Sequence, residues 1–260
     1  MITVGISGAM GRMGVQLIKL VQADADLKLG AAIERADFPG IGGDVGILQG
    51  AGPLGVNLSV QVPPGLDVLI DFSTPDGVAK LIDPCVATRT AMVIGTTGIE
   101  SLKPKLAEAA AAIPILASPN MSVGVNLVFR IAAEIARSLG IDYDIEVVEA
   151  HHRFKKDAPS GTALKIADEI AKATGRSLDE QAVYGRYGKP LDRKPGEIGI
   201  HAVRCGDIVG EHTVIYATLG ERVELKHVAH SRETFARGAL RAAKFIAGRK
   251  PGQYSIADIL

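Results

Sequence analysis

The sequence predicts an α/β fold: a Rossmann-like first domain with a parallel sheet, joined to a second α+β domain with a mixed sheet. In the first half of the chain, short apolar runs alternate with helical segments, which is typical of βαβ units. After Asn120, polar and apolar residues alternate at strand period, which indicates a sheet with one open face. We therefore expect domains at 1–122 and 123–231, with 232–260 packing back on the first.

The first domain is expected to alternate strands and helices throughout. Strands are predicted at 3–7, 27–33, 67–72, 92–94 and 115–117, and helices from Val15 onward, at 75–87 and at 101–112. The segment 37–64 is rich in Gly and Pro and predicts loops, with a hairpin as one option. Strands that alternate with helices imply right-handed crossovers and a sheet covered on both faces.

The second domain is expected to begin with a long helix at 123–139 and to end before a final helix at 234–247. Between these helices, strands are predicted at 144–149, 199–204, 211–216 and 221–227. Their alternation suggests a sheet face turned toward solvent or toward a partner.

Composition narrows the class of protein. The chain has 260 residues, 47% of them hydrophobic, and 29 charges of each sign, which suits an ordinary globular protein. Zero net charge argues against broad binding of nucleic acid or anionic membranes. No apolar run approaches the ~20 residues of a membrane span, the N-terminus lacks a signal-peptide pattern, and Cys85 and Cys205 lack CxxC spacing. We expect a cytoplasmic protein without nucleic-acid or membrane partners.

A glycine loop follows the first predicted strand. Gly8, Gly11 and Gly14 would let the chain turn tightly, so that a pyrophosphate could approach amide N–H groups at a helix N-terminus. Glu34 lies 20 residues after Gly14, at the end of the second strand, where a carboxylate can bind ribose hydroxyls. Arg35 beside it could bind a 2′-phosphate. The alternatives are glycines that only permit packing and a solvated Glu–Arg pair.

Two further segments lie at the carboxyl ends of predicted parallel strands, where open α/β sheets bind ligands. They are Gly95-Thr-Thr-Gly98 and Ser118-Pro-Asn-Met121. Their hydroxyls and the Asn side chain suit ribose and a nicotinamide amide, although ordinary turns use the same residues.

The segment Glu149–Thr162 carries two adjacent histidines and several cations directly after an apolar run. His151 or His152 can deliver a proton near neutral pH. Ser160 is a plausible N-cap of the next helix, and N–H groups around Gly161 and Thr162 could bind a carboxylate that Lys155 neutralises.

Three other interpretations of this segment remain. Adjacent histidines could bind a metal, but they point apart on a strand and no further ligand cluster has suitable spacing, so no metal is expected. The basic run could be a solvated loop, and Ser160 to Thr162 could be only a helix cap.

Over essentially the whole length, the sequence resembles the 4-hydroxy-tetrahydrodipicolinate reductase family, formerly dihydrodipicolinate reductases. The most specific part is Glu149-Ala-His-His-Arg-Phe-Lys-Lys-Asp-Ala-Pro-Ser-Gly-Thr-Ala163. Supporting segments occur in the family's order, namely 8–14, 34–35, 95–98, 120–126 and 204–212.

The resemblance implies NAD(P)H-dependent reduction of a cyclic dicarboxylic imine to tetrahydrodipicolinate, in diaminopimelate and lysine biosynthesis. It implies that His151 is the proton donor or acceptor, Lys155 a second proton donor, and His152, Gly161 and Thr162, with Ser160, the seat of substrate carboxylates. It also implies a homotetramer built through sheets of the second domain. The implied nucleotide-binding residues are Gly8, Ala9, Met10, Gly11, Arg12, Met13, Glu34, Arg35, Gly95, Thr96, Thr97, Ser118, Pro119, Asn120 and Met121.

One departure bears on the cofactor. Some members carry a basic residue where this chain has Thr74, so the choice between NADH and NADPH stays open. Two other functions are weighed: a related dehydrogenase of amino-acid metabolism, and a nucleotide sensor without catalysis. A sensor has no need of the proton donors His151 and Lys155, which favours an enzyme.

Overall fold

The computed structural model describes residues 1–189 and 192–260. Its internal contacts divide the chain into two compact units, Met1–Val123 with Glu233–Leu260 (unit 1) and Gly124–Arg232 (unit 2). Each unit has its own sheet and its own hydrophobic core. A parallel sheet in unit 1 and a mixed sheet in unit 2 confirm the predicted fold class.

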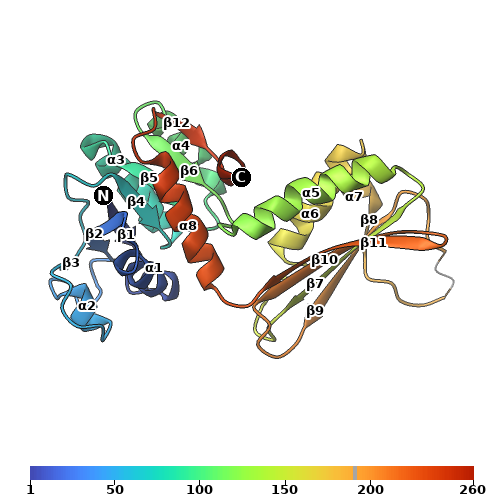
Figure 1. Ribbon diagram of the computed structural model, residues 1–260, viewed down its shortest axis with the longest axis horizontal. Helices are drawn as coiled ribbons and strands as arrows, with labels where there is room; N and C mark the ends of the chain where they lie inside the picture. Colours follow the sequence, from blue (N-terminus) through green and yellow to red (C-terminus); the bar gives the residue numbers. More distant parts are fainter. Residues whose placement is uncertain (190–191) are drawn as a thin grey trace. The chain divides into compact units, whose positions relative to one another are not determined.

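Unit 1, all of whose residues are described, contains a seven-stranded parallel sheet with the order β12-β6-β5-β4-β1-β2-β3. The order reverses between β1 and β4 (Figure 1), and the crevice at such a reversal is where doubly wound sheets bind ligands. The strands are β1 (Ile2–Ser7), β2 (Leu27–Ile33), β3 (Leu58–Ser59), β4 (Val68–Asp71), β5 (Ala91–Ile94), β6 (Pro114–Ala117) and β12 (Gly252–Tyr254).

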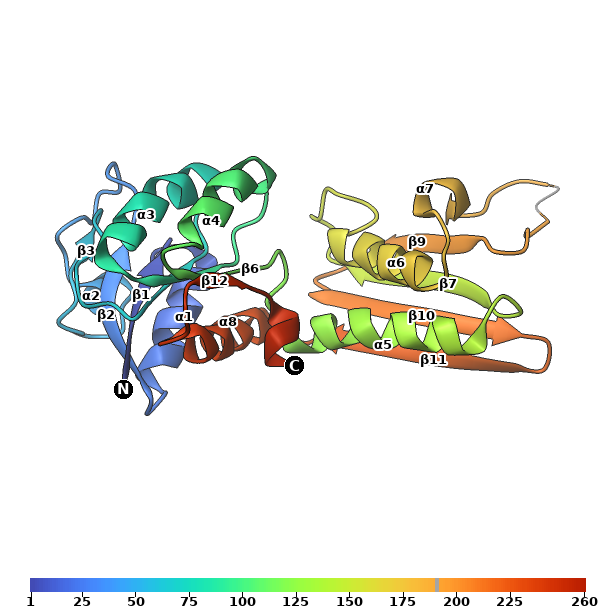
Figure 2. The same ribbon diagram turned by 90° about the horizontal axis from the view of Figure 1, so that it is seen from above.

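Helices cover both faces of this sheet. Figure 2 shows α1 and α8 on one face and α3 and α4 on the other, which is why the central strands are apolar on both sides. The helices are α1 (Arg12–Gln22), α2 (Val45–Leu48), α3 (Pro75–Thr88), α4 (Lys103–Ala109) and α8 (Glu233–Ile246), with 3₁₀ turns at Glu100–Leu102 and Ile256–Ile259.

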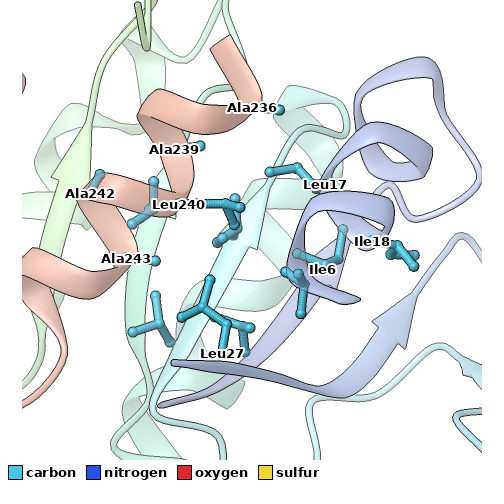
Figure 3. Packing of buried hydrophobic residues seen from close by; sticks show 14 of the residues in the cluster. Ile6, Leu17, Ile18, Leu27, Ala236, Ala239, Leu240, Ala242 and Ala243 are labelled. Carbon is cyan, nitrogen blue, oxygen red and sulfur yellow. The ribbon is translucent and has the colours of Figure 1, made fainter. Parts of the chain in front are cut away.

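The final helix α8 is a structural part of unit 1. Its buried face is rich in alanine, and Figure 3 shows Ala236 and Ala239 turned toward Leu17 of α1. Small side chains let the two helices pack closely. Gly238 lies so near the Met121 carbonyl that a Cβ there would collide with it. The helix therefore fixes the segment that follows β6.

Two details of unit 1 differ from the sequence predictions. No hairpin forms in 37–64. The segment contains α2 and β3 instead, and β3 pairs in parallel with β2, leaving one isolated antiparallel bridge between Asp44 and Asn57. The reason is local: the Asp44 carboxylate accepts hydrogen bonds from the N–H groups of Gly46 and Gly55 and so joins two parts of this segment. Strand β12 was not predicted, because three residues near a chain end carry little periodic signal.

Among the described residues of unit 2, the sheet has five strands in the order β11-β10-β7-β9-β8. β10 is antiparallel to both of its neighbours, whereas β9 is parallel to β7 and β8. The strands are β7 (Asp144–His151), β8 (Ala182–Tyr184), β9 (Ile198–Arg204), β10 (Gly210–Thr218) and β11 (Glu221–Ala229). The helices are α5 (Val123–Leu139), α6 (Gly161–Ala173) and α7 (Leu178–Gln181).

Helices α5 and α6 cover one face of this sheet (Figure 1), and the side chains between them form the core of unit 2. Tyr216 of β10 is fully buried there, and its hydroxyl donates a hydrogen bond to the Ala132 carbonyl of α5 at 2.7 Å. On the other face, β7 and β10 present half-buried residues such as Val148 and Ile215. The alternation predicted from the sequence is thus present.

Candidate active site

The glycine loop of unit 1 turns back sharply after β1. Gly8 has φ +72°, and the amides of Gly8 and Ala9 both donate to the Ile33 carbonyl, at 3.0 and 3.1 Å. A Cβ on Gly14 would lie 2.5 Å from the Ala9 carbonyl oxygen and closer still to that of Gly8. Side chains at these positions would push the loop away from the helix, so the glycines are needed for its shape.

This loop leads directly into α1, an 11-residue helix whose N-cap, Gly11, makes no side-chain capping hydrogen bond. The first N–H groups of a helix lack intrahelical partners and carry a partial positive charge. Arg12, which begins the helix, is exposed. The loop therefore has the geometry of a phosphate cradle.

Glu34 lies at the end of β2, next to the glycine loop. Its half-buried carboxylate accepts the Met10 N–H at 3.1 Å and the Arg35 N–H at 3.1 Å, so it holds the loop while keeping further lone pairs. The Arg35 side chain is exposed and pairs with Asp37 at 3.1 Å. The structure thus brings Gly8 to Met13 and Glu34 together.

The ends of β4 and β5 are tied together by a cluster that the sequence reasoning missed. The Thr96 hydroxyl donates to Asp71 Oδ1 at 2.5 Å, and the Ser73 N–H donates to the same oxygen at 3.1 Å. Asp71 is fully buried and Thr96 nearly so, whereas Thr97 is exposed. Thr96 therefore has a structural partner, and Thr97 is the hydroxyl that faces solvent.

A cavity of about 530 Å³ adjoins these loops within unit 1. Thr96, Thr97, Ser118 and Pro119 line it together with α4, and its far wall includes Gln253 and Tyr254 of β12. Those two residues were missed because β12 was not predicted. Asn120 and Met121 are not among the lining residues: Asn120 Oδ1 accepts the Ser122 N–H at 2.9 Å, and Met121 is buried.

In unit 2, the last residues of β7 carry a Glu–His pair. Glu149 and His151 are two residues apart on a strand and so point to the same face. His151 Nδ1 lies 2.6 Å from Glu149 Oε2, and Glu149 Oε1 accepts the Ser160 N–H at 2.9 Å. Glu149 is fully buried and His151 is 9% exposed.

Arg204 of β9 completes this group. β9 runs parallel to β7 with Arg204 in register with His151, and the guanidinium binds both Glu149 oxygens, at 2.7 and 2.8 Å. A bidentate Arg–carboxylate contact is a strong charge-assisted pair. The period-2 spacing of Glu149 and His151 was visible in the sequence, but the register with Arg204 was not.

The charges of this group set its protonation. Although burial opposes ionisation, hydrogen bonds from Arg204, His151 and the Ser160 N–H keep the pKa of Glu149 below its usual value. Burial lowers the pKa of His151, and the hydrogen bond to Glu149 offsets only part of that effect. His151 is therefore neutral at neutral pH, beside an ionised carboxylate.

A second histidine, His212 of β10, packs edge-on against His151 with ring centroids 5.3 Å apart. Its Nε2 lies 3.2 Å from the Ser160 hydroxyl, which also accepts the Ala163 N–H and so caps α6 as predicted. Burial, with the neighbouring His151, lowers the pKa of His212 to about 3. His212 is thus a neutral packing and hydrogen-bonding partner.

The remaining predicted residues lie around this group. Lys155 Nζ is 3.0 Å from Asp157 Oδ2, and His152 is half-buried beside the exposed ring of Phe154. Gly161 begins α6 with open space where a Cβ would be, and Thr162 follows in the same turn. His151, Lys155 and the N-terminus of α6 therefore form one polar site in unit 2.

Within 1–189 and 192–260, no group of three or more His, Cys, Asp or Glu side chains is placed to hold a metal ion. No helix in the same ranges combines the length and apolar character needed to cross a bilayer.

A Rossmann-like unit with a phosphate cradle, joined to an α+β unit with a buried histidine site, defines the class as a two-domain, dinucleotide-binding oxidoreductase. The chain belongs to the dihydrodipicolinate reductase family. The family model described as "Dihydrodipicolinate reductase, N-terminus" matches residues 2–121. The one described as "Dihydrodipicolinate reductase, C-terminus" matches residues 124–260.

Curated relatives agree over the full length. A 4-hydroxy-tetrahydrodipicolinate reductase of Hahella chejuensis is 49% identical, with 100% of this chain and 99% of the relative covered. One of Anaeromyxobacter dehalogenans is 48% identical, with 100% and 98% covered. Among solved structures, a dipicolinate-bound dihydrodipicolinate reductase from Paenisporosarcina sp. TG-14 has a TM-score of 0.78 at 23% identity, with both chains fully covered. That likeness supports the fold.

Proposed function

We propose that this protein is an NAD(P)H-dependent reductase that converts 4-hydroxy-tetrahydrodipicolinate to tetrahydrodipicolinate, in diaminopimelate and lysine biosynthesis. The observation that carries the proposal is the grouping of His151, Lys155 and the N-terminus of α6 in a chain that also contains a phosphate cradle. Its close relatives share the name of this activity.

Unit 1 would hold the nucleotide. The loop from Gly8 to Met13 offers helix N–H groups to the pyrophosphate, and Glu34 offers its remaining lone pairs to ribose hydroxyls. Thr96, Thr97, Ser118 and Pro119 line the cavity of unit 1, and Gly95 precedes them at the end of β5. The reduced nicotinamide, when bound, supplies a hydride.

Unit 2 would hold the substrate and manage protons. Reduction adds one hydride and one proton to the substrate, and the 4-hydroxy form also loses water. His151 would deliver the proton, with Lys155 as a second donor. The N–H groups at the start of α6, from Gly161 and Thr162, would bind one carboxylate, and His152 with Lys155 the other. Ser160 would contribute indirectly, because its hydroxyl caps α6 and so holds the N-terminus of that helix in place.

The activity is tested by following NAD(P)H absorbance in the presence of the aldol product of pyruvate and aspartate semialdehyde. We expect oxidation of the nucleotide only when that substrate is present. Oxidation without it, or none with it, would remove the proposal. An unrelated 2-oxo acid serves as the control substrate and separates this function from that of a general dehydrogenase.

We further propose that the enzyme accepts both NADH and NADPH. Glu34 can bind the ribose hydroxyls of NADH, and the exposed Arg35 can reach a 2′-phosphate. Thr74, where some relatives carry a cation, caps α3 through the Gly77 N–H instead. Titration of both nucleotides, with and without pyridine-2,6-dicarboxylate, tests this. Dissociation constants within about tenfold of each other are expected, and a difference of a thousandfold would contradict it.

A homotetramer in the cytoplasm is proposed as well. The sheet face of unit 2 opposite its helices keeps half-buried and exposed apolar residues, among them Val148, Ile215 and Val203, which suits contact with a second copy. The exposed free thiol of Cys205 suits a reducing compartment. Light scattering should give a mass of four times the 27.2 kDa chain. A monomeric mass would contradict the oligomer.

A further inference from the structure

We propose that Glu149 and Arg204 form a positioning pair that keeps a proton on His151 Nδ1, so that Nε2 alone gives and takes the catalytic proton. The inference rests on the proposed function, because it assigns roles around the proton donor named there. Neither residue needs to touch the substrate. Both act through the orientation and charge of the His151 ring.

The geometry around Nδ1 leaves little freedom. Glu149 Oε2 lies 2.6 Å from Nδ1, and its other oxygen accepts the Ser160 N–H. A backbone N–H can only donate, and the two guanidinium contacts also only donate. These three donor contacts require an acceptor, which an ionised carboxylate is. The ring nitrogen that faces it must carry hydrogen in both protonation states of His151.

Arg204 keeps the Glu149 carboxylate ionised and fixes its orientation. The guanidinium binds both carboxylate oxygens and is itself held by the Asp157 carbonyl at 2.6 Å and the Val203 carbonyl at 2.7 Å. Because Arg204 balances the charge of Glu149, the carboxylate supports the imidazole without removing its proton. Hydrogen bonds of this kind fix the tautomer of a catalytic histidine.

The opposite nitrogen, Nε2, lies beside the backbone of Gly210 of β10. A Cβ added to Gly210 would lie 3.1 Å from Nε2, so any larger residue at this position would crowd the nitrogen that exchanges the proton. The charged or titratable groups around the ring are Glu149 on β7, Arg204 on β9, His212 on β10 and Lys155 in the following loop.

The alternative is a buried ion pair that only joins β7 to β9. The two roles differ in the effect of each charge on protonation of His151. In Glu149→Gln the amide has one oxygen, and the Ser160 N–H requires it. The NH₂ group then faces Nδ1, which must accept, so neutral His151 carries hydrogen on Nε2 and cannot become a cation easily.

Removal of Arg204 has the opposite effect on the protonation of His151 and favours the protonated ring. In Arg204→Met the carboxylate keeps its charge without a counterion, so the Glu149–His151 pair takes up a proton more readily. An opposite charge within about 4–6 Å shifts a pKa by roughly 1–3 units. Because His151 must be protonated to donate, its pKa sets the alkaline limb of the kcat/KM profile. We expect this limb to move down by about one pH unit or more in Glu149→Gln and up by about one unit in Arg204→Met.

The matched control is Glu146→Gln, which removes a carboxylate from the same strand. Glu146 Oε2 lies 2.7 Å from His201 Nε2, and Glu146 Oε1 accepts a hydrogen bond from Arg193 at 3.2 Å. It lies an odd number of residues from Glu149 and therefore on the other sheet face. Its pH profile should coincide with that of the wild type.

The experiment combines these profiles with ¹⁵N NMR of the histidine rings in the substrate-free protein. In the wild type, neutral His151 should have hydrogen on Nδ1, and in Glu149→Gln on Nε2. Turnover of Glu149→Gln should fall about 100-fold, with dipicolinate affinity retained. Shifts of the same sign in both variants, or an unchanged tautomer, would overturn the inference.

Two further controls keep the result decisive. If Arg204→Met does not fold, Arg204→Lys keeps the charge but not the bidentate contact, and its pH limb should stay at the wild-type position while turnover falls. If the wild type has no reductase activity, the proposed function fails, but the NMR tautomer still tests the positioning pair separately.

Discussion

Replacing Gly14 with Ala tests the role of the glycine loop. The added Cβ would lie 2.5 Å from the Ala9 carbonyl oxygen, whereas ordinary contact begins at 3.4 Å. The loop must therefore move by at least 0.9 Å (3.4 minus 2.5). The added Cβ would collide with the backbone carbonyls of Gly8 and Ala9, so no side-chain rotation relieves the clash. Overpacking of this kind costs about 1–3 kcal/mol of stability.

The same shift displaces the N–H groups that would bind the pyrophosphate. Each hydrogen bond to a charged group is worth about 1.5–3 kcal/mol, and about 1.4 kcal/mol changes a dissociation constant tenfold. Loss of one such bond should raise the Kd for NADH by about 10- to 100-fold. Binding of dipicolinate, which we assign to unit 2, should change less than about twofold.

Isothermal titration calorimetry measures both ligands on the same preparation. Gly161→Ala is a suitable comparison for the nucleotide, because its Cβ would meet no atom within 4 Å. Its affinity for NADH should equal that of the wild type. If Gly14→Ala binds NADH normally while remaining folded, the loop is not the pyrophosphate site.

Three further changes have defined outcomes. His151→Gln should lower kcat by about 100-fold and leave NADH affinity intact, since a general acid contributes roughly that factor; stopped-flow turnover checks this, and an unchanged rate would exclude the role. His212 has a pKa of about 3 in the folded chain against 6.5 in the unfolded one. Only the unfolded state takes up the proton between these values, so stability must fall as pH falls. The wild type should lose about 1 kcal/mol more than His212→Gln between about pH 6.5 and 5.5, as measured by urea unfolding; equal slopes would refute it. Tyr216→Phe, which leaves the buried Ala132 carbonyl without its 2.7 Å partner, should cost about 1 kcal/mol in the same assay, and no loss would show that the bond is dispensable.

Much of the fold could be predicted because its elements are strongly periodic. The segment Leu27–Ile33 and the helix Val123–Leu139 occur with the expected bounds. The errors are in short elements held by side chains rather than by periodicity. Asp44 shapes the loop that was expected to allow a hairpin, and β12 exists because β6 leaves an edge to pair with.

The site was predictable where it is local in sequence. Ser160 as a helix cap, and His151 with Lys155 as neighbours, follow from one segment of the chain. Arg204 and His212 could not be assigned, because their positions depend on which strands flank β7 and in which register. The assignments of substrate and nucleotide to individual residues stay predictions.

The most direct test of the proposed reduction is a single-turnover experiment with NADH deuterated at both C4 positions. Enzyme in excess is mixed with one equivalent of the nucleotide and the 4-hydroxy-tetrahydrodipicolinate substrate, and the product is analysed by mass spectrometry. We predict tetrahydrodipicolinate that carries one deuterium, formed in proportion to the NADH consumed. Product without deuterium, or consumption of NADH without this product, would contradict the account.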